Sequence, residues 1–97
     1  MAKGYWIAFV TVTDPDRYAG YQQQAPAAFA NYGARFLAQG GAAETLEGTA
    51  YQRHVLIEFD SKATALACYH SPEYQSARTH RQAACTAQIA IVEGLEP

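Results

Sequence analysis

The sequence carries little charge: Lys and Arg together number 7, Asp and Glu number 9, and the formal net charge is −2. This balance leaves no cationic surface of the kind that binds nucleic acid or anionic membranes. No apolar run approaches the roughly 20 residues that span a bilayer. Cys68 and Cys85 are the only cysteines, and they do not form a C-x-x-C pair. We expect both to be small buried residues, with a disulfide or a reactive thiol as the alternative.

What the chain does contain is hydrophobic residues, which make up 49% of its 97 residues. A chain of this size and composition forms a single globular domain, here residues 1–97. The N-terminal segment leads directly into strand-like sequence without the apolar stretch or cleavage site of a signal peptide. We therefore expect a cytoplasmic protein.

Four segments have the composition and alternation of β-strands. They are Gly4–Thr13, Ala34–Gln39, Arg53–Phe59 and Thr86–Val92. The first segment places Tyr5, Ile7, Phe9 and Thr11 on one face and Trp6, Ala8, Val10 and Val12 on the other. Both faces are largely apolar, which is typical of a sheet that is covered on both sides.

The first helix follows Asp14, a good N-cap, with Pro15 at its first position. Its apolar stripe consists of Tyr18, Tyr21, Ala25, Phe29 and Tyr32. Pro26 lies inside this stretch and is expected to kink the helix or split it into two. Gly33 is suited to the position just after the helix ends.

The second helical region has two start signals. Asp60-Ser61 predicts a helix that reaches His70, and Ser71-Pro72-Glu73 predicts a restart that continues to about Ala84.

Gly40-Gly41 ends the second strand, where a turn or bulge requires positive φ, and 42–52 is expected to be a loop.

The element order β-α-β-β-α-β predicts an α+β, ferredoxin-like sandwich: a four-stranded antiparallel sheet with helices on one face. The helices can cover only one face of this sheet. The other face is also apolar, so we expect a homodimer that packs sheet against sheet.

Several segments also resemble a known family. They are Gly4-Tyr5-Trp6, Asp14-Pro15 with Tyr18 and Tyr21, the run 32–41 (YGARFLAQGG), Leu46-Glu47-Gly48, Glu58-Phe59, Tyr69, the run 71–75 (SPEYQ), Arg81 and Val92-Glu93-Gly94. Over nearly the whole chain they resemble the uncharacterised family called domain of unknown function 1330. The resemblance implies a dimeric α/β-barrel, in a superfamily with cofactor-free monooxygenases, muconolactone-isomerase-like enzymes and chlorite-dismutase-like haem proteins. It implies no assigned reaction.

Tyrosines and one arginine share the inward faces of the predicted helices. Tyr74 and Arg81 lie seven residues apart on one helix face, and Tyr18 and Tyr21 lie on the stripe of the first helix. With Tyr69, these residues are candidates to bind a small anionic or enolic ligand between helices and sheet. The alternative is a structural role, in which the tyrosines belong to the core and Arg81 pairs with Glu58 or Asp14.

His54 is a candidate general base on the third strand, because an unperturbed imidazole titrates near pH ~6.5. The alternatives are a structural sheet histidine or a dimer-interface residue. The spacings typical of metal ligands, such as H-x-H or H-E-x-x-H, are not present in the sequence. We therefore expect neither a metal nor an organic cofactor.

Arg35 and Arg53 lie on strands with apolar neighbours and are expected to form interfacial ion pairs with Glu44 or Glu47.

The sequence therefore supports three hypotheses about function. The first is a small enzyme-like protein that binds a carboxylated or aromatic metabolite for cofactor-free proton transfer, of isomerase or lyase type, with His54, Tyr74 and Arg81 as catalytic residues. The second is a non-catalytic dimeric module that acts in binding or in stress. The third is a redox protein that uses Cys68 or Cys85.

Overall fold

The computed structural model describes residues 1–97. Its elements are β1 (Gly4–Val12), α1 (Pro15–Asn31), β2 (Arg35–Gln39), β3 (Arg53–Phe59), α2 (Lys62–His70), α3 (Pro72–Arg81) and β4 (Cys85–Glu93). The predicted order is confirmed, and the second helical region is divided at Ser71 into α2 and α3.

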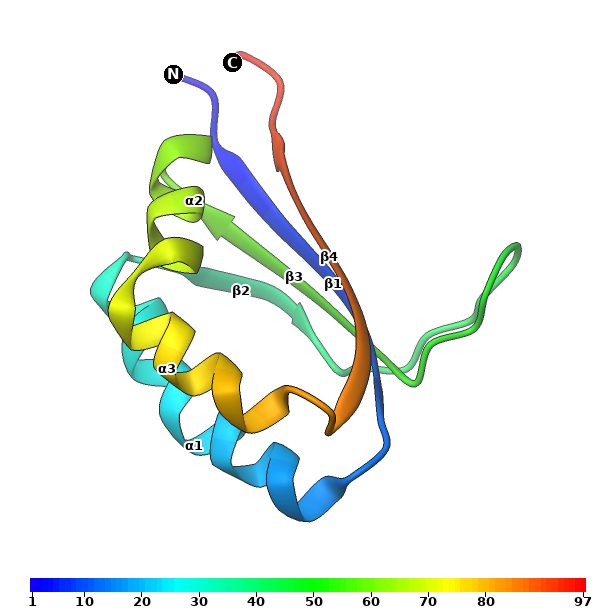
Figure 1. Cartoon of the computed structure of the whole chain (residues 1–97). Coiled ribbons are helices and arrows are strands. Elements are labelled where there is room, and N and C mark those ends of the chain that lie inside the picture. Colours follow the sequence, from blue (N-terminus) through cyan, green and yellow to red (C-terminus); the bar gives the residue numbers. More distant parts are fainter.

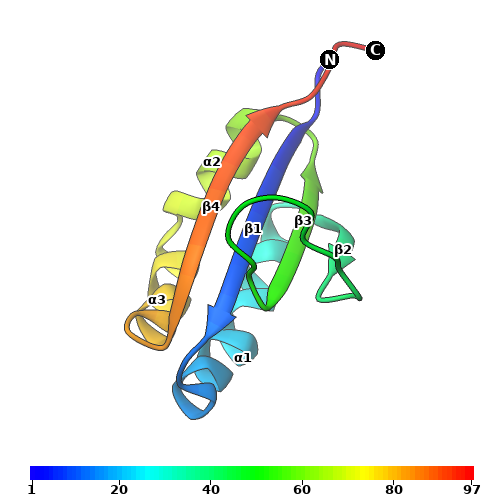
Figure 2. The same ribbon diagram turned by 90° about the vertical axis from the view of Figure 1, so that its right-hand side faces the viewer.

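The strands form one antiparallel sheet in the order β2-β3-β1-β4. All three helices cover one face of the sheet, and the loop between β2 and β3 projects from the other side (Figures 1 and 2). The N- and C-termini lie together at one end of β1 and β4 (Figure 1). This is the α+β, ferredoxin-like arrangement that the sequence predicts.

Hydroxyl and carboxylate caps begin each helix at the predicted residue. Asp14 Oδ1 accepts a hydrogen bond from the Arg17 amide at 3.2 Å. Ser61 Oγ and Ser71 Oγ each accept one from the amide three residues on, at 3.1 Å. These bonds satisfy N–H groups that have no partner within the helix.

Two details of the helices differ from the predictions. Helix α1 runs unbroken from Pro15 to Asn31, so Pro26 does not split it. Pro26 removes one helical donor, but its neighbours Ala25, Ala28 and Phe29 are all buried, and their packing holds the helix together across that gap. Helix α3 ends at Arg81 rather than near Ala84.

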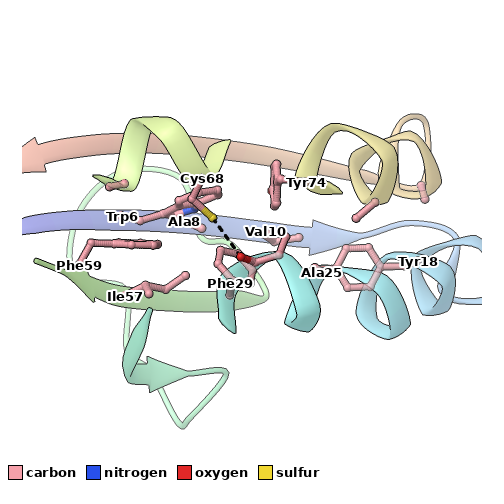
Figure 3. Close-up of a cluster of buried hydrophobic side chains, with 14 residues drawn as sticks. Trp6, Ala8, Val10, Tyr18, Ala25, Phe29, Ile57, Phe59, Cys68 and Tyr74 are labelled. Carbon is pink, nitrogen blue, oxygen red and sulfur yellow. Dashed lines mark hydrogen bonds between the residues drawn. The ribbon is translucent and has the colours of Figure 1, made fainter. Parts of the chain in front are cut away.

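The core lies between the helices and the inner face of the sheet, and it is centred on Trp6, Phe29, Phe59 and Tyr74 (Figure 3). Trp6 is 1% exposed, and its ring meets those of Phe29 and Tyr74 edge-on at centroid distances of 5.1 and 5.0 Å. The close contact of β1 with the start of α2 requires Gly4, because a Cβ there would lie 2.5 Å from the Lys62 backbone nitrogen.

The other face of the sheet is not covered by helices, and its centre is apolar. We call this surface the open face. It carries Tyr5, Ile7, Phe9 and Thr11 of β1, His54, Leu56 and Glu58 of β3, and Thr86, Gln88, Ala90 and Val92 of β4. Tyr51 from the projecting loop packs on Phe9 with ring centroids 5.8 Å apart.

Candidate functional site

A cavity of about 110 Å³ lies between α1 and the inner face of the sheet. We call it the inner cavity. Its walls are mostly apolar and include Ala8, Val10, Phe29, Ile57 and Ile89. Its polar side chains are Tyr18, Tyr21, Gln22, Gln39, Arg53 and Arg81, with Trp6 as a further ring. The exposed side chains of Gln22 and Gln39 mark its mouth.

Arg81 is the most unusual residue of the inner cavity, because its side chain is charged and only 9% of the residue is exposed. One terminal nitrogen donates to the Tyr74 hydroxyl at 3.3 Å, and Nε is buried without a partner. The guanidinium carbon lies 5.4 Å from the centre of the Tyr21 ring, so the ring face supplies a cation–π contact. Helix α3 places Tyr74 and Arg81 two turns apart on its inward face.

No carboxylate pairs with Arg81, so the predicted pairing with Glu58 or Asp14 is wrong. Glu58 instead accepts hydrogen bonds from Arg35 Nε at 2.9 Å and from the Tyr5 hydroxyl at 3.0 Å. Asp14 caps α1. A buried guanidinium without a counter-charge is costly in a protein, because burial removes the water that solvated it.

Two phenol groups lie beside this guanidinium and are joined by a hydrogen bond. The hydroxyls of Tyr21 and Tyr74 are 2.9 Å apart. Burial raises the pKa of Tyr21 well above its usual 10.0. Burial also raises the pKa of Tyr74, although Arg81 opposes that shift. Both phenols therefore stay protonated near neutral pH and act as hydrogen-bond donors rather than bases.

Arg53 is a second cation at the same cavity, and the sequence predictions did not assign it to the site. It lies on the inner face of β3, in register with Val10 of β1, and it makes no ion pair within the chain. Arg35 pairs instead with Glu58 and Asp60, at 2.9 and 3.1 Å. The predicted partners Glu44 and Glu47 do not pair with either arginine in the chain. A signal was available in the sequence, because Arg53 shares the alternation of Val55 and Ile57.

The structure brings together only some of the candidate residues. Tyr18, Tyr21 and Arg81 line the inner cavity. Tyr74 reaches the site through its hydroxyl, and Tyr69 packs behind it with ring centroids 5.4 Å apart. His54 lies on the open face, in register with Phe9, so the sheet separates it from Arg81. Any chemistry that uses Arg81 therefore proceeds without His54 of the same chain.

Both cysteines are free, and they lie away from the cavity walls. Burial raises the pKa of the Cys68 thiol to about 11, so little thiolate forms near neutral pH. No group of three His, Cys, Asp or Glu side chains converges as a metal site would require. None of the helices combines the length and the hydrophobicity of a membrane span.

Solved structures with the same fold come from several bacteria. A protein of unknown function from Rhodopseudomonas palustris is 23% identical and superposes with a TM-score of 0.75 over 99% of this chain and 85% of its own. A dimeric ferredoxin-like protein of unknown function from Jannaschia sp. CCS1 is 15% identical, with a TM-score of 0.70 over 93% and 97%. A cofactor-independent oxygenase from Streptomyces nogalater is 14% identical, with a TM-score of 0.65 over 100% and 97%. At these identities the likeness shows a shared fold.

No curated protein sequence matches the chain. A family model does match the chain, over residues 3–95, from the residue before β1 to the segment after β4. The chain therefore belongs to the family named domain of unknown function DUF1330.

Proposed function

We propose that the protein binds a small carboxylate in the inner cavity, with Arg81 as its anchor. The observation that carries this proposal is the buried guanidinium that lines the cavity and lacks a carboxylate partner. A guanidinium and a carboxylate form paired, charge-assisted hydrogen bonds, which would use the free Nε–H group of Arg81. A bound carboxylate would thus supply the missing counter-charge.

The walls restrict the rest of the ligand. At about 110 Å³ the inner cavity is somewhat smaller than an engineered apolar cavity of about 150 Å³ that binds benzene. It therefore suits a compact acid whose body is a short hydrocarbon, or a single ring that extends toward the open side of the cavity. The Tyr21 hydroxyl can donate a hydrogen bond to a second oxygen of the ligand.

Calorimetric titration with benzoate and its uncharged analogue benzamide tests the anchor. We expect benzoate to bind and benzamide to bind at least about tenfold more weakly, because a hydrogen bond to a charged group contributes about 1.5–3 kcal/mol. Arg81→Met should abolish the preference for benzoate. Arg17→Met is the matched control, because Arg17 is an exposed arginine of α1 outside the cavity. Equal binding of both compounds to the wild-type protein would refute the proposal.

We further propose that any reaction in this cavity is a cofactor-free proton transfer, in which Arg81 and the Tyr21 hydroxyl stabilise an enolate. A proton would leave the carbon next to a carbonyl group, its electron pair would form the enolate, and water would accept the proton. Water is the proton acceptor because the polar side chains that line the cavity, which are arginines, glutamines and protonated tyrosines, do not act as bases. The competing hypothesis, a non-catalytic binding module, is favoured by the same lining, since none of these groups is a base near neutral pH.

Deuterium exchange separates these two hypotheses. In heavy water, a catalyst of enolisation incorporates deuterium into a 2-oxo acid such as phenylpyruvate faster than buffer does. We expect Tyr21→Phe to slow this exchange while carboxylate binding is retained, because Phe keeps the ring beside Arg81. Binding without any accelerated exchange in the wild-type protein would identify a non-catalytic module.

We also propose that the protein forms a homodimer through the open face. The support is the apolar centre of that face, where Ile7 lies between Leu56 and Ala90 in the register of three strands. A neighbour with the same fold, from Jannaschia, is dimeric.

Ile7→Asp should produce a monomer in analytical ultracentrifugation, because a carboxylate would be buried there without a partner. Ala27→Asp, at an exposed position of α1, should remain dimeric. A monomeric wild-type protein at micromolar concentration would exclude this assembly.

A further inference from the structure

A second cavity adjoins the first at the end of β1 and the start of α1. This outer cavity has a volume of about 360 Å³, is more open to solvent and is lined mainly by polar residues. Its lining residues are Val12, Pro15, Tyr18, Gln22, Gly40, Gln52 and Arg53. Tyr18, Gln22 and Arg53 line both cavities, so the two adjoin at these three side chains.

Arg53 is the cation at this junction, and its charge is not neutralised by the protein. Neither cavity has an aspartate or glutamate in its lining, and Arg53 takes part in no ion pair. Burial raises the pKa of Tyr18, and Arg53 and Arg81 both oppose that shift, so both charges act on the same phenol. Two guanidiniums thus line adjoining cavities: the Arg81 guanidinium lines the inner cavity alone, and that of Arg53 lines both.

Gly40 leaves the space that the Arg53 guanidinium occupies. A Cβ at this position would lie 3.2 Å from the guanidinium carbon, and the backbone there has a φ of +69°. A side chain at residue 40 would therefore press on the charged group and strain the turn. The absence of a side chain at Gly40 therefore leaves room for the Arg53 guanidinium beside the cavities.

We infer that the ligand is a dicarboxylate with an apolar middle. This inference rests on the proposed function: Arg81 binds the inner carboxylate, and Arg53 binds the second carboxylate at the junction of the two cavities. The apolar residues of the inner cavity, including Val10 and Ile89, would face the hydrocarbon part. Two cations at adjoining cavities, with apolar residues lining the inner one, favour this class over monocarboxylates, which would form charge-assisted hydrogen bonds with only one of the two guanidiniums.

Calorimetric titration with glutarate, adipate and pimelate tests the inference, each paired with the monocarboxylate of the same chain length. We expect the best dicarboxylate to bind the wild-type protein at least about tenfold more tightly than its monocarboxylate partner. Arg53→Gln should weaken the dicarboxylate by at least about tenfold more than the monocarboxylate and so remove this preference. Gly40→Ala should also reduce the preference. Arg17→Gln removes the same charge away from both cavities and should change neither affinity.

The outcomes distinguish a failure of the dicarboxylate inference from a failure of the proposed function. If the wild-type protein binds both classes equally, or if Arg53→Gln weakens both equally, the dicarboxylate inference fails while carboxylate binding stands. If no acid binds the wild-type protein, or if Arg81→Met binds every acid like the wild type, the proposed function itself fails. Circular dichroism of each variant confirms that the affinities refer to folded protein.

Discussion

Replacing Arg81 by methionine should leave the ligand-free protein as stable as the wild type, or make it more stable. In the folded state the guanidinium gains one long hydrogen bond, of 3.3 Å to Tyr74, and contacts with two tyrosine rings at 5.4 and 6.0 Å. These contribute about 1 kcal/mol and about 0.5–1 kcal/mol each, roughly 2–3 kcal/mol in all. Burying the charge costs several kcal/mol, so the two effects nearly cancel or favour methionine.

The substitution leaves no further buried polar group without a hydrogen-bond partner. The change in stability therefore reports on the loss of the guanidinium itself. The Tyr74 hydroxyl keeps its hydrogen bond to Tyr21 at 2.9 Å. Methionine is unbranched and adapts to irregular space, so it fills most of the volume that the arginine stem occupied. We expect the free energy of unfolding to change by no more than about 1 kcal/mol in the unfavourable direction.

Urea denaturation, followed by the fluorescence of the single tryptophan, measures this change. Trp6 is 1% exposed in the folded state, so its emission shifts when the core opens. The protein concentration is held fixed, because a dimer becomes more stable as concentration rises. Arg17→Met should change stability by less than about 0.5 kcal/mol, as surface substitutions usually do. A loss of about 3 kcal/mol or more for Arg81→Met would refute the reasoning, since it would show that Arg81 stabilises the fold.

Three further predictions test the cysteines, the phenols and the packing of β1. Cys68 should not react with iodoacetamide at pH ~7.5 in the folded protein, because burial raises its pKa to about 11. Cys85 is partly exposed and is the thiol open to labelling. Rapid labelling of Cys68, detected by mass spectrometry, would contradict this prediction. Burial also raises the pKa of Tyr21, so the stability that this phenol contributes is complete below pH ~10 and is lost as pH rises above it. Tyr21→Phe should therefore make the loss of stability above pH ~10 less steep in urea titrations, and an unchanged slope would contradict the assignment. Gly4→Ala should cost about 1–3 kcal/mol, because its Cβ would meet backbone atoms at 2.5 Å. Gly41→Ala, where nothing lies within 4 Å of the added Cβ, should be nearly neutral, and urea denaturation of the two variants measures the difference.

The sequence predicted the fold well because its local signals agree with one another. Asp14, Ser61 and Ser71 are caps that form only at helix starts, and all three begin the helices that they predict. Pro26 shows the limit of such signals. Its local preference is to break a helix, but the buried residues around it outweigh that preference.

The candidate site could be predicted only in part, because two facts about it are not local. The i, i+7 spacing on α3 correctly placed Tyr74 and Arg81 on one face. The sequence could not indicate which face of β1 the helices cover, since Ile7 and Phe9 are as apolar as Ala8 and Val10. The same ambiguity left the positions of His54 and Arg53 open, although their parity places them on opposite faces.

Strand β3 shows how one thin sheet serves two separate purposes. Arg53, Val55 and Ile57 line the inner cavity, whereas His54, Leu56 and Glu58 lie on the open face. Because the strand period is two, a shift of one residue in register would exchange the two sets and bury His54 and Glu58 against the helices. The bulge of β2, which falls between Phe36 and Ala38, keeps Phe36 and Gln39 beside the cavity without such a shift in β3. The proposed ligand site and the proposed dimer face therefore use different side chains of the same strand, which is why a substitution such as Ile7→Asp can test assembly without altering a residue that lines the cavity.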